Sequence, residues 1–100
     1  MAKTKLRIYD AAEYLDSEED MAAYLEAAFE EGDSALVVQA LGAIAKARGI
    51  AQISKETGLR RESLRRALSP GGNPELAILL KVVRALGIRL HAESTHANLQ

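Results

Sequence analysis

Four glycines divide most of the chain into segments of helical length, and their spacing constrains the fold more than any other feature. Gly32, Gly49, Gly58 and Gly87 each follow a segment whose length and apolar spacing suit a helix. Glycine often ends a helix because it adopts the left-handed backbone conformation without a steric penalty. With 100 residues, 48% of them hydrophobic, the chain is long enough for one compact domain and too short for two. The sequence therefore predicts a single domain, residues 1–100, of the all-α class.

Capping signals set the predicted boundaries of five helices. The run SEED, which begins at Ser17, is a capping box, and Asp33 is the expected N-cap of the next helix. Asn73 as N-cap, followed by Pro74 at the first helical position, starts the last helix. The predicted helices span residues 18–31, 34–48, 51–57, 61–68 and 74–86.

The two ends of the chain have different patterns. Residues 1–9 have no clear helical period, so KLRIY is either a short strand or an unstructured arm, and DAAEYL from Asp10 favours one short helical turn. Residues 88–93, IRLHAE, alternate apolar and polar side chains, which is the period of a half-buried strand. Because such a strand is not stable alone, and the last helix is apolar on more than one face, we expect a homodimer with contacts at Ile88 and Leu90. Residues 94–100 are expected to be a frayed tail.

The two short helices at 51–57 and 61–68 have the layout of a helix-turn-helix, with Gly58 first in the turn. Ser54 lies where the two helices approach closely and only a small side chain fits. The apolar pattern agrees with this layout, since the inward positions hold Ile53, Thr57, Leu59, Leu64, Ala67 and Leu68. Residues 34–87 are therefore predicted to form a helix-turn-helix core.

Charged side chains cover the outward side of the second short helix. With Leu64 pointing inward, steps of about 100° per residue place Glu62, Arg65 and Arg66 on the opposite side. In the major groove of DNA, arginine pairs with guanine and glutamate accepts a hydrogen bond from cytosine. We therefore expect DNA contacts from Arg60, Arg61, Glu62, Ser63, Arg65 and Arg66. The alternative is a helical hairpin whose arginines only form a solvated face.

The charges of the chain are divided between its two parts. Residues 1–33 carry three basic and ten acidic side chains, a net charge of -7, whereas residues 34–100 carry ten basic and four acidic ones, a net charge of +6. Such a division suggests that the two parts meet partners of opposite sign. Segregation of surface charge without any partner is the alternative.

Several stretches closely resemble a known family. DAAEYLDSEEDMAAYLEAAFEEGD, ALGAIAKARGIAQISKETGL and RESLRRALSPGGNPELAILLKVVRALGIRL are similar to addiction-module antidote proteins, a HigA-like antitoxin group with a Cro/C1-type (XRE family) helix-turn-helix. The resemblance covers roughly residues 8–92. It implies a lambda-repressor-like domain of five to six helices that dimerises, neutralises a small RelE/ParE-like toxin and represses its own operon by binding operator DNA.

The resemblance also gives the acidic part of the chain a role. A toxin that binds RNA on the ribosome is expected to be basic, so an acidic surface would attract it. The residues expected to meet the toxin are Glu18, Glu19, Glu26, Glu30 and Glu31. Two other functions fit the sequence: a phage-like transcriptional regulator without a toxin, and a protein-interaction module that has lost DNA binding.

Other chemistry has little support in the sequence. There is no cysteine, and His91 and His96 lack partners at metal-ligand spacing, so we expect no metal, no cofactor and no enzymatic activity. The N-terminus lacks the apolar run of a signal peptide, and the longest apolar segment, LAILLKVV, is interrupted by Lys81. We therefore expect a cytoplasmic protein with no membrane contact.

Overall fold

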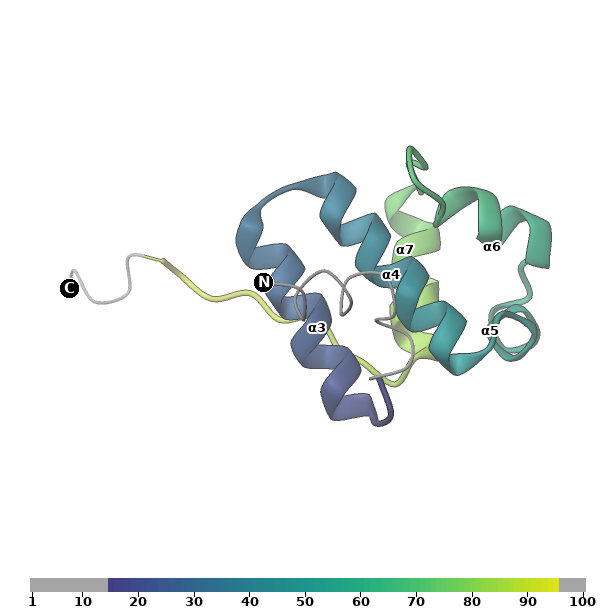
Figure 1. The fold of residues 1–100 in the computed structure, drawn as a ribbon, viewed down its shortest axis with the longest axis horizontal. Coiled ribbons are helices and arrows are strands. Elements are labelled where there is room, and N and C mark those ends of the chain that lie inside the picture. The colour runs from purple at the N-terminus through teal and green to yellow at the C-terminus, as the bar shows by residue number, and fades with distance from the viewer. Residues whose placement is uncertain (1–14, 96–100) are drawn as a thin grey trace, which may run out of the picture.

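The computed structural model describes residues 15–95, and this part of the chain forms five helices and no strand (Figure 1). Their bounds are α3, Glu18–Glu31; α4, Ser34–Arg48; α5, Ile50–Thr57; α6, Arg61–Ala67; and α7, Leu76–Ala85. The predicted all-α class is confirmed for these residues. The predictions for residues 1–14 and 96–100 lie outside the described part of the chain.

The predicted ends of α3 and α4 are confirmed by their caps. The Ser17 hydroxyl accepts a hydrogen bond from the Asp20 N–H at 3.1 Å, which satisfies one of the free donors at the start of α3. Gly32 ends that helix in the left-handed conformation, with φ +71°. Asp33 caps α4 by accepting from the Ala35 N–H at 2.9 Å. Both helices therefore start and stop through local side-chain and backbone chemistry.

The predicted start of α7 is wrong, because the helix begins at Leu76 and not at Pro74. Glu75 still has an extended backbone, with φ -63° and ψ 152°, so neither Asn73 nor Pro74 lies in the helix. Asn73 and Pro74 line a hollow of about 330 Å³ together with residues of α3, α4 and α7, and the Glu75 N-cap has no side-chain hydrogen bond. Smaller differences are found at α5, which starts one residue early after an N-cap at Gly49, and at α6, which ends one residue early.

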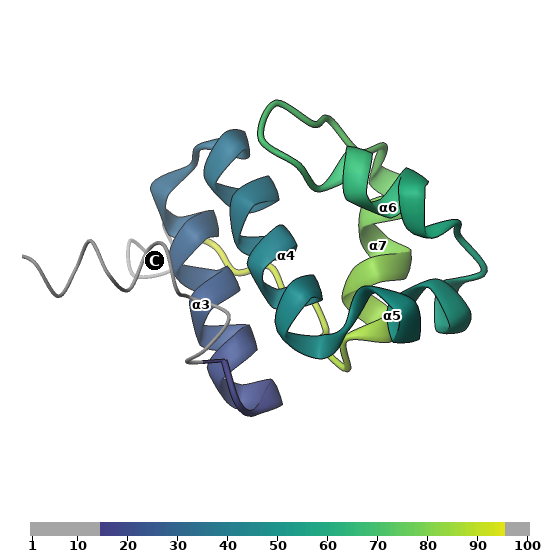
Figure 2. The same cartoon turned by 45° about the vertical axis from the view of Figure 1, so that its right-hand side comes forward.

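The hydrophobic core lies where the five helices meet, with α4 between α3 on one side and α5, α6 and α7 on the other (Figures 1 and 2). Every helix contributes to it. The large side chains that are fully buried are Leu25, Leu41, Ile44, Ile53, Leu64, Val82 and Leu86. Burial of one such side chain stabilises the fold by about 1.5–3 kcal/mol, so each helix is held mainly by its apolar face.

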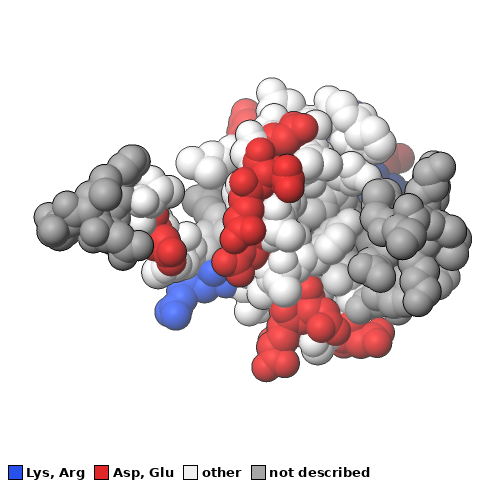
Figure 3. Space-filling view, turned by 60° about the vertical axis from the view of Figure 1, so that its left-hand side comes forward, with Lys and Arg blue, Asp and Glu red and all other residues white. Residues whose placement is uncertain are grey.

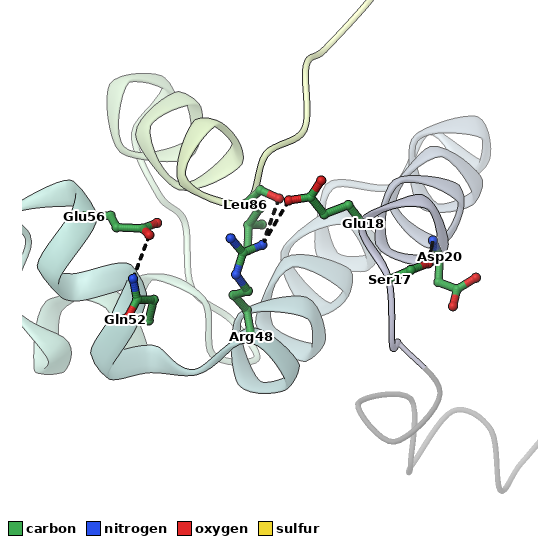
Figure 4. A network of polar contacts seen from close by, with 7 residues as sticks. All are labelled: Ser17, Glu18, Asp20, Arg48, Gln52, Glu56 and Leu86. Atoms are coloured by element: carbon green, nitrogen blue, oxygen red, sulfur yellow. Dashed lines mark hydrogen bonds and ion pairs between the residues drawn. The ribbon is translucent and has the colours of Figure 1, made fainter.

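Arg48, the last residue of α4, joins α4 to the ends of two other helices (Figure 4). Its Nη1 donates to the carbonyl oxygen of Leu86 at 3.2 Å and lies 3.6 Å from Oε2 of Glu18. Gly87 allows this approach, since its φ is +77° and a Cβ there would lie 2.6 Å from Oε2 of Glu18. This junction sets the start of α3 against the end of α7.

The segment 88–93, predicted as a strand, has no regular secondary structure in the described chain. Ile88 is half-buried and packs against the core, while Leu90 remains 38% exposed. Figure 1 shows the segment leaving α7 and running behind α3. A single strand is not stable without a second strand to pair with. A strand at residues 88–93 therefore stays a prediction for the homodimer.

None of the five described helices is long and apolar enough by itself to cross a membrane. Only α4 and α5 taken together have that length and composition, and the chain bends by 100° between them.

Alanine is normally more stable than glycine inside a helix, but the close contact between α4 and the end of α6 should reverse this order at Gly42. A Cβ on Gly42 would lie 2.7 Å from the carbonyl oxygen of Leu68, so G42A should lower the free energy of unfolding by about 1–3 kcal/mol. At Gln39, an exposed site on the same helix, alanine should be more stable than glycine by about 1 kcal/mol. Urea denaturation of G42A, Q39A and Q39G measures both differences. A stabilised G42A would contradict the close packing of Leu68 against α4.

Candidate nucleic-acid interface

Two hydroxyl groups fix the turn between α5 and α6. The Ser54 hydroxyl donates to the carbonyl oxygen of Leu59, and Oγ1 of Thr57 accepts from the Leu59 N–H at 3.1 Å. The Thr57 hydroxyl also donates to the Ile53 carbonyl at 2.7 Å. Gly58 supplies the left-handed conformation that the turn requires, with φ +78°. Both backbone polar groups of Leu59 are thereby satisfied, and α6 is held in a defined direction from α5.

The side chains of α6 that point inward fix its rotation about its own axis. Leu64 is 1% exposed and Leu68 is 6% exposed, and both belong to the core. After the helix, Gly72 lies so close to the carbonyl oxygens of Arg66 and Ala67 that a Cβ would be 2.7 and 2.3 Å from them. The predicted inward side of the helix is confirmed by these contacts.

The structure exposes all six predicted DNA-contacting residues, five of them on α6 and Arg60 at its N-cap. These residues are Arg60, Arg61, Glu62, Ser63, Arg65 and Arg66. None of the four guanidinium groups makes an ion pair with another side chain in residues 15–95. An exposed surface with four cations and one carboxylate has a positive potential, which suits a polyanionic partner.

Sequence reasoning missed one cation beside this surface. Lys46 of α4 and Arg65 of α6 line the same hollow of about 440 Å³, whose other lining residues are Gly42, Ala45, Ile50 and Leu68. Lys46 is exposed there. The helix dipole alone accounts for a lysine in the last turn of α4, and only the packing of α6 against α4 shows that it lies beside the arginines.

The predicted toxin-contacting residues divide into three groups on α3. Steps of about 100° place Glu19, Glu26 and Glu30 in one outward stripe, and all three are exposed. Glu18 instead lies beside Arg48, and Glu31 lines a hollow between α3 and α4. Residues 15–33 contain eight acidic side chains and no basic one. Figure 3 shows a band of carboxylates on this side of the molecule.

The described part of the chain contains no group of three side chains that could hold a metal ion. Nε2 of His91 lies 3.6 Å from Oε1 of Glu93, and both side chains are largely exposed. His96 lies outside the described residues.

Comparison with known proteins identifies the family of the chain. Residues 5–94 match the model of a family described as probable addiction module antidote protein. The chain belongs to this family. It is 40% identical over 91 residues to an uncharacterised protein of Haemophilus influenzae, an alignment that covers 91% of this chain and 94% of that protein. No solved structure gives a significant match to the chain.

Membership of the antidote family assigns a role and one partner in general terms. An antidote acts against the toxin of its addiction module, so the chain has an antitoxin role in a toxin–antitoxin module. The resemblance to addiction-module antidotes that was read from the sequence is confirmed at this level.

The hydroxyl contacts in the turn predict different effects for two substitutions of Thr57. T57V keeps the shape of the side chain but removes the acceptor for the Leu59 N–H, so it should lower the free energy of unfolding by about 1–2 kcal/mol. T57S retains the hydroxyl and should lose less than half of that. Urea denaturation of both variants provides the comparison, and equal stabilities would show that the hydroxyl does not hold the turn.

Proposed function

We propose that this antitoxin neutralises a small RelE/ParE-like toxin and represses its own operon by sequence-specific binding of operator DNA through α6. The observation that carries the DNA-binding part is the outward face of α6. There, three guanidinium groups on α6 and a fourth at its N-cap, Arg60, are exposed and unpaired within residues 15–95, and the helix is held by a hydroxyl-bonded turn. The layout of α5 and α6 supports a helix-turn-helix of the Cro/C1 type.

The geometry of α6 suits a recognition helix because its inward and outward sides are well separated. Leu64 is buried against the core, so the outward side chains can enter a groove without disturbing the packing. Arg61 and Arg66 are then the candidates for base or phosphate contacts, with Glu62 between them. Lys46 and Lys55, which are also exposed, add cations on the neighbouring helices.

The outward stripe of α3 is the proposed toxin-binding surface. Glu19, Glu26 and Glu30 present carboxylates on one side of the helix, and α3 contains no basic residue that would neutralise them. A toxin that binds RNA needs a basic surface, and this stripe would attract that surface and compete with phosphate. Of the five glutamates that sequence reasoning selected, these three are the ones we place at the centre of the contact.

The two proposed surfaces lie on different sides of α4, which separates α3 from α6 (Figures 1 and 2). One chain can therefore contact DNA and toxin at the same time. Of the alternatives, a regulator without a toxin agrees poorly with the antidote family, whereas an interaction module without DNA binding remains an outcome of the experiments below.

The first experiment concerns the salt dependence of DNA binding. If four to six phosphates are contacted per dimer, log K should fall with log salt concentration with a slope of about -4 to -5, because each contact releases about 0.9 counterion. Fluorescence anisotropy with promoter DNA of the operon, at several salt concentrations, measures this slope. Absence of binding even at low salt would favour the interaction module.

The second experiment separates the two activities. R61A/R66A should abolish operator binding in a gel-shift assay, because loss of a bidentate arginine–guanine contact costs about 1–3 kcal/mol at each half-site. The same variant should still rescue cells from the toxin. E26K/E30K should show the opposite pattern, since it reverses the charge of the α3 stripe and leaves α6 unchanged.

Circular dichroism and thermal melting of both variants control for folding. If R61A/R66A is folded but no longer neutralises the toxin, the toxin also uses α6, and the assignment of the toxin to α3 is wrong.

A further inference from the structure

A groove of about 380 Å³ lies between α3 and the segment that follows α7. Figure 1 shows this segment running behind α3. The side chains that line the groove come from both elements: Ala22, Leu25, Glu26 and Phe29 from α3, and Ile88, Arg89, Leu90 and His91 from the segment. Leu25 is buried and Ile88 is half-buried, so these two side chains close the groove toward the core.

The groove leaves two large apolar side chains in contact with water. Phe29 is 42% exposed and Leu90 is 38% exposed, and they come from opposite walls. Ala22 keeps the space between the walls open, because its side chain is a single methyl group. An exposed hollow with apolar walls is typical of a site that receives a large apolar side chain of a partner protein.

The charges of the two walls indicate which partner suits the groove. Ala22, Glu26 and Phe29 follow one another at positions i, i+4 and i+7, so Glu26 stands on the same side of α3 as the apolar wall. Glu26 also belongs to the outward stripe of α3, and Glu30 follows it one turn later. The opposite wall carries Arg89, which is exposed. A partner with basic side chains next to an apolar one is therefore attracted to the α3 wall and repelled by the other.

We propose that this groove is the anchor site of the toxin. A large apolar side chain of the toxin enters between Phe29 and Leu90, and basic side chains beside that anchor contact Glu26 and Glu30. The inference deepens the proposed function and rests on its assignment of the toxin to α3. A second copy of the chain suits the groove less well, because two copies joined groove to groove would bring their Glu26 carboxylates together.

Filling the groove tests the anchor site without removing any contact. A22L places a larger side chain between the two walls, so it should raise the dissociation constant of the complex with the toxin of the module by about tenfold or more. A27L is the matched control, because Ala27 is exposed on the other flank of α3 and lines the hollow between α3 and α4. It should change the dissociation constant less than about twofold. Isothermal titration calorimetry with the purified toxin measures both. An A22L variant that binds as tightly as the wild type would overturn the proposal.

Truncating one wall gives a second, independent test. F29A should also weaken toxin binding about tenfold, and F29M, which keeps an apolar wall, should retain most of the affinity. L36A is the control, because Leu36 is 37% exposed, close to the value of Phe29, but lies outside the groove. If L36A weakens binding as much as F29A does, the anchor is not specific to this groove and the proposal is wrong.

Charge reversal on each wall tests the orientation of the toxin. E26K should weaken the complex, whereas R89E should tighten it about two- to threefold, because R89E removes a cation from the path of a basic partner. A loss of affinity in R89E as large as that in E26K would show that the basic side chains of the toxin do not face α3, which contradicts the proposal.

Two controls separate the possible failures. Circular dichroism and light scattering of each variant without toxin report folding and mass. If A22L or F29A changes the mass but keeps the affinity for the toxin, a second copy occupies the groove and the proposal is overturned. If E26K/E30K weakens the complex while A22L and F29A bind normally, the groove is wrong and the toxin still uses α3. If none of these variants weakens the complex, the assignment of the toxin to α3 fails as well.

Discussion

The burial of Leu64 is the contact on which the proposed DNA-binding surface depends. A helix of seven residues is not stable in water by itself, so α6 exists because Leu64 and Leu68 are packed into the core and because the turn before it is closed by hydrogen bonds to Leu59. Once Leu64 points inward, the position of every other side chain on α6 follows. The arginines are exposed as a consequence of that packing.

The proposed toxin-binding surface depends on how the acidic helix α3 is attached to the rest of the fold. α3 packs along α4, and Arg48 fixes its start by contacting both Glu18 and the carbonyl oxygen of Leu86. The Glu18 side chain is 60% exposed, so the ion pair contributes little energy, and the hydrogen bond and the packing matter more. Glu18 therefore has a structural contact that separates it from Glu19, Glu26 and Glu30, although all four look equivalent in the sequence.

Sequence patterns predicted those features whose causes are local. The caps at Ser17 and Asp33 and the glycine at the turn depend on residues within three positions of one another, so α3, α4 and the helix-turn-helix were predicted to within one residue. The start of α7 was predicted wrongly because the Asn-Pro signal allows a helix at Pro74 but does not require one, and the backbone is still extended at Glu75.

The candidate site was predictable in part for the same reason. The outward positions on α6 follow from helical periodicity alone. The position of Lys46 beside Arg65 depends on how α4 and α6 pack, and the exposure of Leu76 and Leu80 depends on which side of α7 the core uses. Their apolar character alone would place them in the core, and only the fold shows that they lie outside it.

The central claim, that α6 binds DNA while α3 remains free for the toxin, is tested most directly by NMR titration of the isotopically labelled antitoxin. Operator DNA should shift or broaden the backbone amide signals of residues 57–68 and leave those of residues 19–30 unchanged, and subsequent addition of the toxin should then perturb residues 19–30. Perturbation of α3 by DNA, or of α6 by the toxin with equal strength, would contradict the separation of the two surfaces.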